Sequence, residues 1–272
     1  MTHFIFLLAC LLSFHAFSQL FRVHPEKKIE PVELAVTYRK VMQMDSLDPQ
    51  DLRNEKMLLW IGRNTSVFFS YYRHIAEEKN KQLSKAEIIA WMNSHPKPQI
   101  GLTYRIHKNY PEGKITNIDA VLTDLFLYHE KMPLFTWEIQ AATGTILGYP
   151  VQKATTRFRG RSWVAWFAPG VPISDGPYKF HGLPGLILKM YDTRNHFLFE
   201  ALSIESPSEP QMIVFIMRDY FRTTVENFFR TRHASRIDAS ASISHMVPDG
   251  HARSIMAENI RRRFNPIELR LE

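Results

Sequence analysis

Short apolar segments that alternate with turn-forming clusters are the feature that most constrains the fold of this chain. From Gln19 to about Ser206, runs rich in Val, Ile, Thr, Tyr and Phe recur at short spacing, and Gly, Pro, Asn and Asp separate them. Leu34 to Met44 and Lys56 to Ile61 are two examples, with the polar stretch from Asp45 to Asp51 between them. Such runs form strands, and short connections join neighbouring strands in antiparallel order. The sequence therefore predicts a β-rich α+β domain with a mainly antiparallel sheet and a few helices.

Helical signals are few. Ser84, with Glu87 three residues later, forms a capping-box pattern before an apolar run, which predicts a helix over residues 84–93. The last part of the chain, about 218–272, is basic and helix-permissive, except for a polar stretch at 235–250 that we expect to be irregular. The helices are therefore expected to accompany the sheet rather than to alternate with its strands.

The amino-terminal segment, residues 1–18, has the features of a cleaved signal peptide. Phe4 to Phe17 is apolar, and Ala16-Phe17-Ser18 puts small residues where a signal peptidase reads, which would leave Gln19 as the first residue. The run is short for a bilayer and no stop-transfer pattern follows, so we expect no transmembrane span after processing. The alternatives are an uncleaved anchor or a lipid anchor on Cys10. The segment predicts export to the periplasm or the cell exterior.

Composition and charge narrow the class of protein. Residues 19–272 are expected to form a single domain, because a chain that is 45% hydrophobic and 22% charged can bury a sizeable core without metals or disulfides. The net charge of +7 can attract anionic lipid or acidic glycans, which an exported protein meets more readily than nucleic acid. A solubility charge without a partner is the alternative. Loss of Cys10 on processing would exclude disulfides, thiolate zinc sites and a cysteine nucleophile.

Basic and aromatic residues gather in residues 151–195, which hold seven basic and two acidic side chains. Alternate residues of a strand share a face, so an uninterrupted strand without a bulge at Gly160 would run from guanidinium groups to aromatic rings. Such a face could bind an amphiphilic or anionic ligand, and the alternative is a strand that is solvated at one end and packed at the other. The candidate ligand-binding residues on this face are Arg157, Arg159, Arg161, Trp163 and Phe167.

Two turn signals follow this strand. Asp175-Gly176-Pro177 is the first, and Leu183-Pro184-Gly185-Leu186 matches a type II turn with Pro and Gly at its two central positions. Leu186 to Asp192 then reads as a strand that returns over His196 to Ile204, which predicts a hairpin. His181 precedes the second turn and is a further candidate for ligand binding, with capping or solvation of the turn as the alternative.

These segments together resemble a known family, and their order and close spacing make the likeness specific. The matching segments are Gly148 to Ala154, Phe158 to Arg161, Ala165 to Phe167, Pro172-Ile173, Gly176 to Phe180, Asn265 to Leu269 and the signature Gly182, Leu183, Pro184, Gly185, Leu186 and Ile187. With these segments the chain is similar to the GLPGLI family of exported proteins from the Bacteroidetes, also called the Porphyromonas gingivalis-type family. The resemblance implies export and a β-rich fold, and it brings no catalytic residues because the family has no established activity. Many members carry a cysteine near the position of Val151, so a thiol-based role cannot be transferred here.

Catalytic and metal-binding patterns are weak. No G-x-S-x-G motif or phosphate-binding glycine loop is present, and the tempting trio of Ser174, Asp175 and His181 consists of near neighbours on a turn, which seldom point at one another. His245 and His251 lack the spacing of a metal-binding pair on a helix. We therefore expect no cofactor and no metal, and an enzymatic activity stays open.

The sequence leads to one main functional hypothesis and two alternatives. The main one is a non-enzymatic envelope protein that binds a ligand or a partner, with a sheet that by fold-level analogy resembles the curved sheets of periplasmic lipoprotein carriers. The alternatives are an exported hydrolase and an accessory partner of an outer-membrane transporter.

Overall fold

The computed structural model describes residues 23–95, 104–122, 124–246, 251, 258 and 265–270. The expected signal peptide at residues 1–18 lies outside these residues, as does nearly all of the helix-permissive stretch at 252–264. The strands are β1 (Glu26–Pro31), β2 (Leu34–Gln43), β3 (Leu52–Ile61), β4 (Ser66–Ser70), β5 (Arg105–Lys108), β6 (Lys114–Val121), β7 (Asp124–Lys131), β8 (Glu138–Ile146), β9 (Tyr149–Phe158), β10 (Arg161–Ala168), β11 (Leu186–Asp192), β12 (Phe197–Glu205), β13 (Met212–Ile216) and β14 (Phe221–Arg222). The helices are α2 (Tyr71–Gln82), α3 (Lys85–Ser94) and α4 (Val225–Met246).

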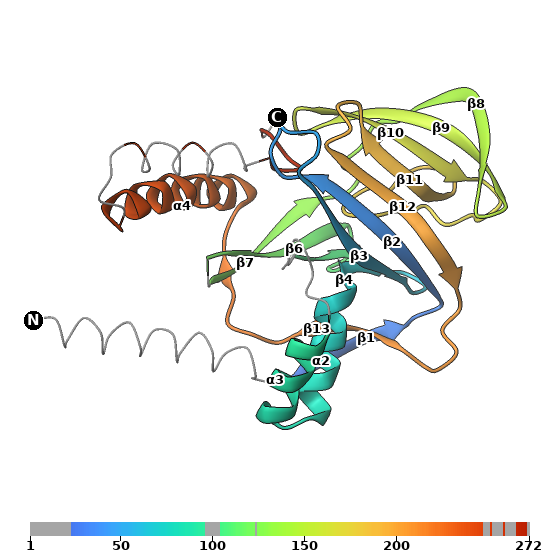
Figure 1. Ribbon diagram of the computed structural model, residues 1–272. Helices are drawn as coiled ribbons and strands as arrows, with labels where there is room; N and C mark the ends of the chain where they lie inside the picture. The colour runs from blue at the N-terminus through green and yellow to red at the C-terminus, as the bar shows by residue number, and fades with distance from the viewer. Residues whose placement is uncertain are drawn as a thin grey trace, which may run out of the picture.

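One large open sheet dominates the described part of the chain. Its twelve strands follow the order β14-β7-β6-β5-β4-β3-β2-β12-β11-β10-β9-β8, and β1 pairs with β13 in a separate two-stranded sheet. The strand pairs are antiparallel except for β14 with β7. Figure 1 shows β8 to β12 gathered at the upper right, α4 beside β7, and α2 with α3 below the sheet. This architecture confirms the predicted β-rich α+β class.

Local signals set several elements as the sequence predicts. β2 and β3 pair in continuous register from Leu34 opposite Ile61 to Gln43 opposite Leu52. α3 carries the predicted capping box: Ser84 Oγ accepts from the Glu87 backbone N–H, and the Glu87 carboxylate accepts from the Ser84 N–H at 2.8 Å. Because both orphan donors are satisfied, this helix begins where the sequence places it.

The turn between β9 and β10 corrects the expectation of one continuous basic strand. Arg159 and Gly160 form a two-residue turn with φ values of +49° and +80°. Both values lie in the left-handed region that tight hairpin turns require, and glycine adopts it without steric cost. Consequently Arg157 lies opposite Ser162 and Arg161 lies opposite Phe158 on the neighbouring strand. The expectation that the three arginines share one strand face is wrong, because the chain reverses at Gly160.

The predicted type II turn at Leu183 to Leu186 also takes another form. Its closing bond would join the Leu186 N–H to the Leu183 carbonyl, but the Leu186 N–H donates to Val171 at 3.0 Å, and the Gly185 N–H donates to Leu183 at 2.8 Å. A Cβ on Gly185 would lie 2.7 Å from the carbonyl carbon of Ala168. Gly185 is therefore needed mainly because the segment lies close to the end of β10, and less because of a particular turn type.

The main core shows that the sheet curves around its own connection. Ile106 of β5 and Ala154 of β9 belong to one buried cluster, although their strands lie far apart in the strand order. Figure 1 shows the sheet curving between these two strands. The cluster also includes Tyr178, Phe180 and Leu183 from the segment that joins β10 to β11. This connecting segment therefore fills the space that the curved sheet encloses.

The carboxyl-terminal part differs in one respect from the expectation. α4 continues through Met246, so the stretch expected to be irregular from residue 235 is helical for most of its length. No Gly or Pro interrupts the chain between Arg222 and Met246, and alanine favours a helix. Beyond the helix, residues 265–270 lie against the β9–β10 turn, where the Leu269 N–H donates to Arg159 O at 2.9 Å.

Candidate functional site

The signature segment lies mostly in the core, with Gly182 and Pro184 exposed. Phe180, Leu186 and Ile187 are fully buried, and His181 retains only 5% of its exposure. The Trp137 indole N–H donates to the His181 carbonyl at 2.8 Å, and the Phe180 ring lies 4.8 Å from the Trp163 ring, centroid to centroid. The side that a curved lipid carrier would leave open is therefore occupied by the chain itself.

A buried ion cluster fastens this segment to the end of the chain. Lys179 Nζ lies 2.5 Å from Glu130 Oε2 and 2.6 Å from Glu268 Oε1, and Arg159 binds Glu130 at 2.8 Å. The Tyr178 hydroxyl donates to Glu268 at 2.5 Å. Burial acts to raise the pKa of Glu268, but the charge and hydrogen bond of Lys179, the hydrogen bond from Tyr178 and the charge of Arg159 together lower it. These charged groups therefore join the segment before the signature to β7 and to the carboxyl-terminal residues.

The six residues expected to bind a ligand occupy separate environments. Trp163 and Phe167 are 0% and 1% exposed, and Arg161 is 3% exposed. The Arg161 guanidinium binds Asp192 at 2.9 Å and also donates to Asn265 and Pro266 of the carboxyl-terminal segment. Arg159 and His181 belong to the interior contacts described above, and Arg157 is exposed. The structure does not bring the six together on an open surface, and ligand binding by them stays a prediction.

The trio considered for hydrolysis does not form a proton relay. Ser174 Oγ accepts from the Gly182 backbone N–H at 3.1 Å. Asp175 pairs with Lys108, whose Nζ also donates to the Gly176 carbonyl at 2.5 Å. His181 Nδ1 is bonded to the Lys179 carbonyl at 2.7 Å, and burial lowers the pKa of its ring. Ser174 and His181 thus bind the local backbone, Asp175 binds Lys108, and within the described part of the chain no hydrogen bond joins the serine to the histidine.

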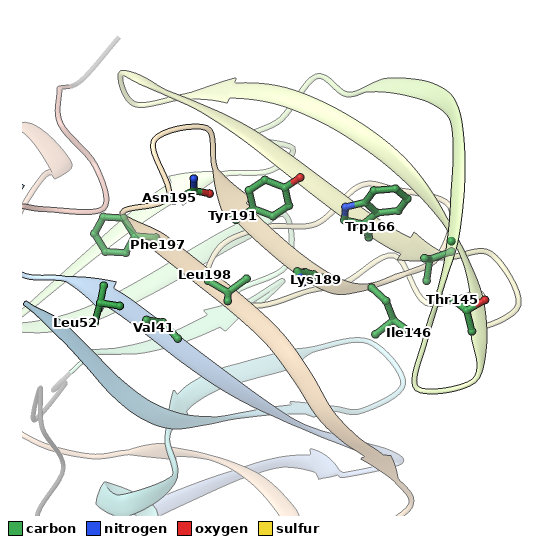
Figure 2. Close-up of a pocket in the computed structure, with 12 residues that line it drawn as sticks. Val41, Leu52, Thr145, Ile146, Trp166, Lys189, Tyr191, Asn195, Phe197 and Leu198 are labelled. Carbon is green, nitrogen blue, oxygen red and sulfur yellow. The ribbon is translucent and has the colours of Figure 1, made fainter. Parts of the chain in front are cut away.

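The other face of the sheet carries an open groove of about 690 Å³. Figure 2 shows Val41, Leu198 and Tyr191 side by side on β2, β12 and β11, with Trp166 and Thr145 on the far side of the groove. Register explains the row, because Leu198 lies opposite both Val41 and Tyr191 on its neighbouring strands. The lining residues are Val41, Leu52, Gly144, Thr145, Ile146, Val151, Trp166, Lys189, Tyr191, Asn195, Phe197 and Leu198. Most are aliphatic or aromatic, so the groove suits an apolar ligand.

A charged row runs beside this apolar row. Glu200 lies between two cations, with Arg39 at 2.6 Å and Lys189 at 2.9 Å. The hydrogen bond from Lys189, followed by that from Arg39, lowers the pKa of Glu200. Trp166 lies opposite Lys189 on one side and Lys153 on the other. Three cations against one anion leave a positive row beside an apolar floor.

Sequence reasoning missed this groove, although one signal for it was present. In a strand from Leu186 to Asp192, alternation puts Leu186, Leu188 and Met190 on one face, so Lys189 and Tyr191 face the opposite side. What the sequence could not show is that the β8–β9 hairpin bends toward this face, with Gly144 above the Trp166 ring. A Cβ on Gly144 would lie 3.5 Å from that ring.

Metal and membrane features are not found in the described residues. Across the described ranges, no group of three His, Cys, Asp or Glu side chains is arranged to hold a metal ion. None of the helices that the structure describes has the length and apolar character needed to cross a bilayer.

Fold and site define a β-rich protein whose signature segment fills its own sheet and whose other face carries an amphiphilic groove. The family model described as "Protein of unknown function (Porph_ging)" matches residues 159–189. This match confirms the resemblance: the chain carries the signature of the Porphyromonas gingivalis-type, or GLPGLI, family. The family's function is unknown, so the match adds no activity.

One solved structure supports the fold. "Structure of PNGF-II in P21 space group" is similar with a TM-score of 0.51 and 14% identity, and covers 75% of this chain and 34% of that chain. A second structure, in the C2 space group, has a TM-score of 0.48 and 14% identity and covers 75% and 33%. This chain thus spans about a third of that neighbour's length, and at this identity the likeness shows the fold alone. No curated protein matches the chain.

Proposed function

We propose that this protein binds an amphiphile without transforming it, and that the ligand lies in the groove between β2 and the β8–β9 hairpin. The observation that carries the proposal is the combination of an apolar groove of about 690 Å³ with a flanking positive row. Pockets of this size accept ligands of ordinary small-molecule dimensions. An acyl or other apolar chain fits the row of Val41, Leu198 and Tyr191, and an anionic head group fits Lys189.

The electrostatics favour an anion over a cation. Lys189 already binds Glu200, but Glu200 is shared with Arg39, so one positive charge of the triad remains unbalanced. A ligand carboxylate or phosphate at Lys189 forms a charge-assisted hydrogen bond, which is about twice as strong as a neutral one. A cationic head group would be repelled by Arg39, Lys189 and Lys153. The selectivity of the groove is therefore expected to follow head-group charge.

The second part of the proposal is that the protein is exported. An amphiphile-binding protein of the envelope agrees with the signal peptide expected at residues 1–18 and with the net charge of +7. Amino-terminal sequencing of the protein recovered from the periplasm or the medium tests the location, and Gln19 is the first residue expected. Recovery only from the cytoplasm, starting at Met1, would refute export.

Fluorescence of 11-(dansylamino)undecanoic acid tests the groove. Binding to the wild-type protein should raise the dansyl emission, and dodecanoate should displace the probe whereas dodecyltrimethylammonium should not. Leu198→Asp places a carboxylate on the apolar floor and should abolish binding. Lys189→Gln should weaken binding about tenfold, equivalent to about 1.4 kcal/mol.

The matched control for Leu198→Asp is Leu202→Asp. Leu202 lies on the same strand, is 46% exposed and does not line the groove. The Leu202→Asp variant should therefore bind the probe with the same affinity as the wild-type protein. No emission change with the wild type, or equal displacement by the anionic and the cationic competitor, would refute the proposal.

A further inference from the structure

The large sheet ends in an unusual edge strand. β8 is the last strand of the order and, among the described strands, pairs only with β9. Most of its residues are exposed, and Ile139 on β8, Leu147 in the following turn and Tyr149 at the start of β9 are 47%, 45% and 36% exposed. An edge strand presents unpaired backbone N–H and C=O groups to any further strand. β8 is therefore open to pairing in a way that no interior strand is.

The opposite edge of the same sheet is protected. β14 consists of two residues, Phe221 and Arg222, and the chain turns into α4 within three residues. Phe228 of α4 packs on Tyr128 of β7 with ring centroids 4.9 Å apart. A very short edge strand is a common protection against edge pairing, and α4 packs on the adjacent strand β7. Within the described residues the sheet thus has one long open edge, so edge-to-edge association through it can form a closed pair but not a fibre.

The low charge of the β8 edge indicates which kind of partner can pair with it. Edge strands are usually protected by lysine, proline or inward-pointing charges. Between Met132 and Gln152 the sequence has one charged residue, Glu138, although the whole chain carries a net charge of +7. This stretch holds β8 and the start of β9. Two copies of this edge can therefore approach each other without bringing like charges opposite one another, while the rest of the basic surface stays apart.

We propose that β8 pairs with β8 of a second copy of this chain, antiparallel about a two-fold axis. The pairing stretch is Thr143 to Ile146, where β8 is in regular register with β9. The three residues before it form a bulge, held by a hydrogen bond of 2.9 Å from Gln152 Nε2 to Gln140 O. An antiparallel two-fold is self-complementary, so each residue on one copy meets its own counterpart or a near neighbour on the other. The pairing joins two sheets into one.

Charge reversal across the two-fold axis gives a specific test. Thr143 and Thr145 are exposed on one face of β8, so the double change to lysine leaves folding intact and puts like charges opposite each other. By sedimentation velocity, the wild-type protein should approach twice the mass of one chain as its concentration rises. The double lysine variant and the matching double glutamate variant should each remain monomeric, and an equimolar mixture of the two should recover the dimer.

Leu202→Lys is the control, because it adds a charge at an equally exposed position away from the edge, and it should dimerise like the wild type. Thermal melting of each variant checks that all are folded. A wild-type protein that stays monomeric at all concentrations would overturn the proposal. So would a dimer that persists in either charged variant, or a mixture that fails to recover the dimer. The readout is mass, so it is independent of ligand binding in the groove.

Discussion

Replacing Gly185 with alanine should strongly destabilise the protein, because of the close approach between the signature and the end of β10. The added Cβ would lie 2.7 Å from the Ala168 carbonyl carbon and 3.0 Å from Pro169 Cα. Ordinary contacts begin at 3.4 Å, so the backbone must move by at least 0.7 Å, the difference between 3.4 and 2.7. Ala168 is paired with Leu186, so the movement also disturbs the β10–β11 ladder. Overpacking of this severity costs about 3 kcal/mol.

Gly170→Ala is the matched control in the same connecting segment. A Cβ on Gly170 meets nothing within 4 Å, so this change should be neutral or stabilise the protein by less than about 1 kcal/mol. Urea unfolding followed by tryptophan fluorescence measures both. In thermal melts, a loss of about 3 kcal/mol lowers Tm by roughly 6 to 12 °C in a domain of this size. Unfolding free energies of the two variants within about 1 kcal/mol of each other would refute the packing argument.

Two further predictions concern buried ionisable side chains and are measured by the same unfolding assay. Lys179→Met leaves Glu130 and Glu268 buried without their shared cation, so it should cost about 3 to 5 kcal/mol, whereas Lys81→Met at an exposed pair should cost less than about 1 kcal/mol. Similar losses in both variants would contradict this reading. Burial lowers the pKa of His107 to about 3, well below the value of the unfolded chain. As the pH falls, His107 therefore becomes protonated in the unfolded chain at a higher pH than in the folded protein. The free energy of unfolding should then fall by up to about 1.4 kcal/mol per pH unit as the pH drops below about 6.5. His107→Phe should flatten this dependence, and an unchanged slope would exclude His107 as its source.

Local signals were sufficient to predict the elements that depend on neighbouring residues. The capping box at Ser84 and Glu87 fixes the start of α3, and the strand from Leu186 to Asp192 forms the hairpin that its alternation predicts. The sequence did not predict the turn at Arg159 and Gly160, because Arg-Gly is not one of the usual hairpin dipeptides such as Asn-Gly or Asp-Gly, although it supplies the glycine. Treating Gly160 as part of one strand put the three arginines on a single face, which the reversal of the chain forbids.

Contacts between distant segments could not be predicted from the sequence. Arg161 binds Asn265 across 104 positions, and Lys179 meets Glu268 in the core. Nothing local to these residues indicates the partner, because a buried cation and an exposed one look alike in a basic segment. The same limit hid the groove, whose walls come from β2, β11 and β12 on one side and the β8–β9 hairpin on the other.

The placement of the signature decides where binding can occur. Lys179 and Arg161 form ion pairs with Glu130 and Asp192 inside the chain, and breaking a buried pair of this kind costs about 3 to 5 kcal/mol. A ligand that used these groups would have to offset that loss before it gained any affinity. The side chains of Trp166, Lys189 and Tyr191 instead face the groove, and the signature holds their strands in register through Gly185 and Leu186. In the proposed function the signature therefore acts through the position of β10 and β11, and variants of its buried residues should change stability before they change ligand selectivity.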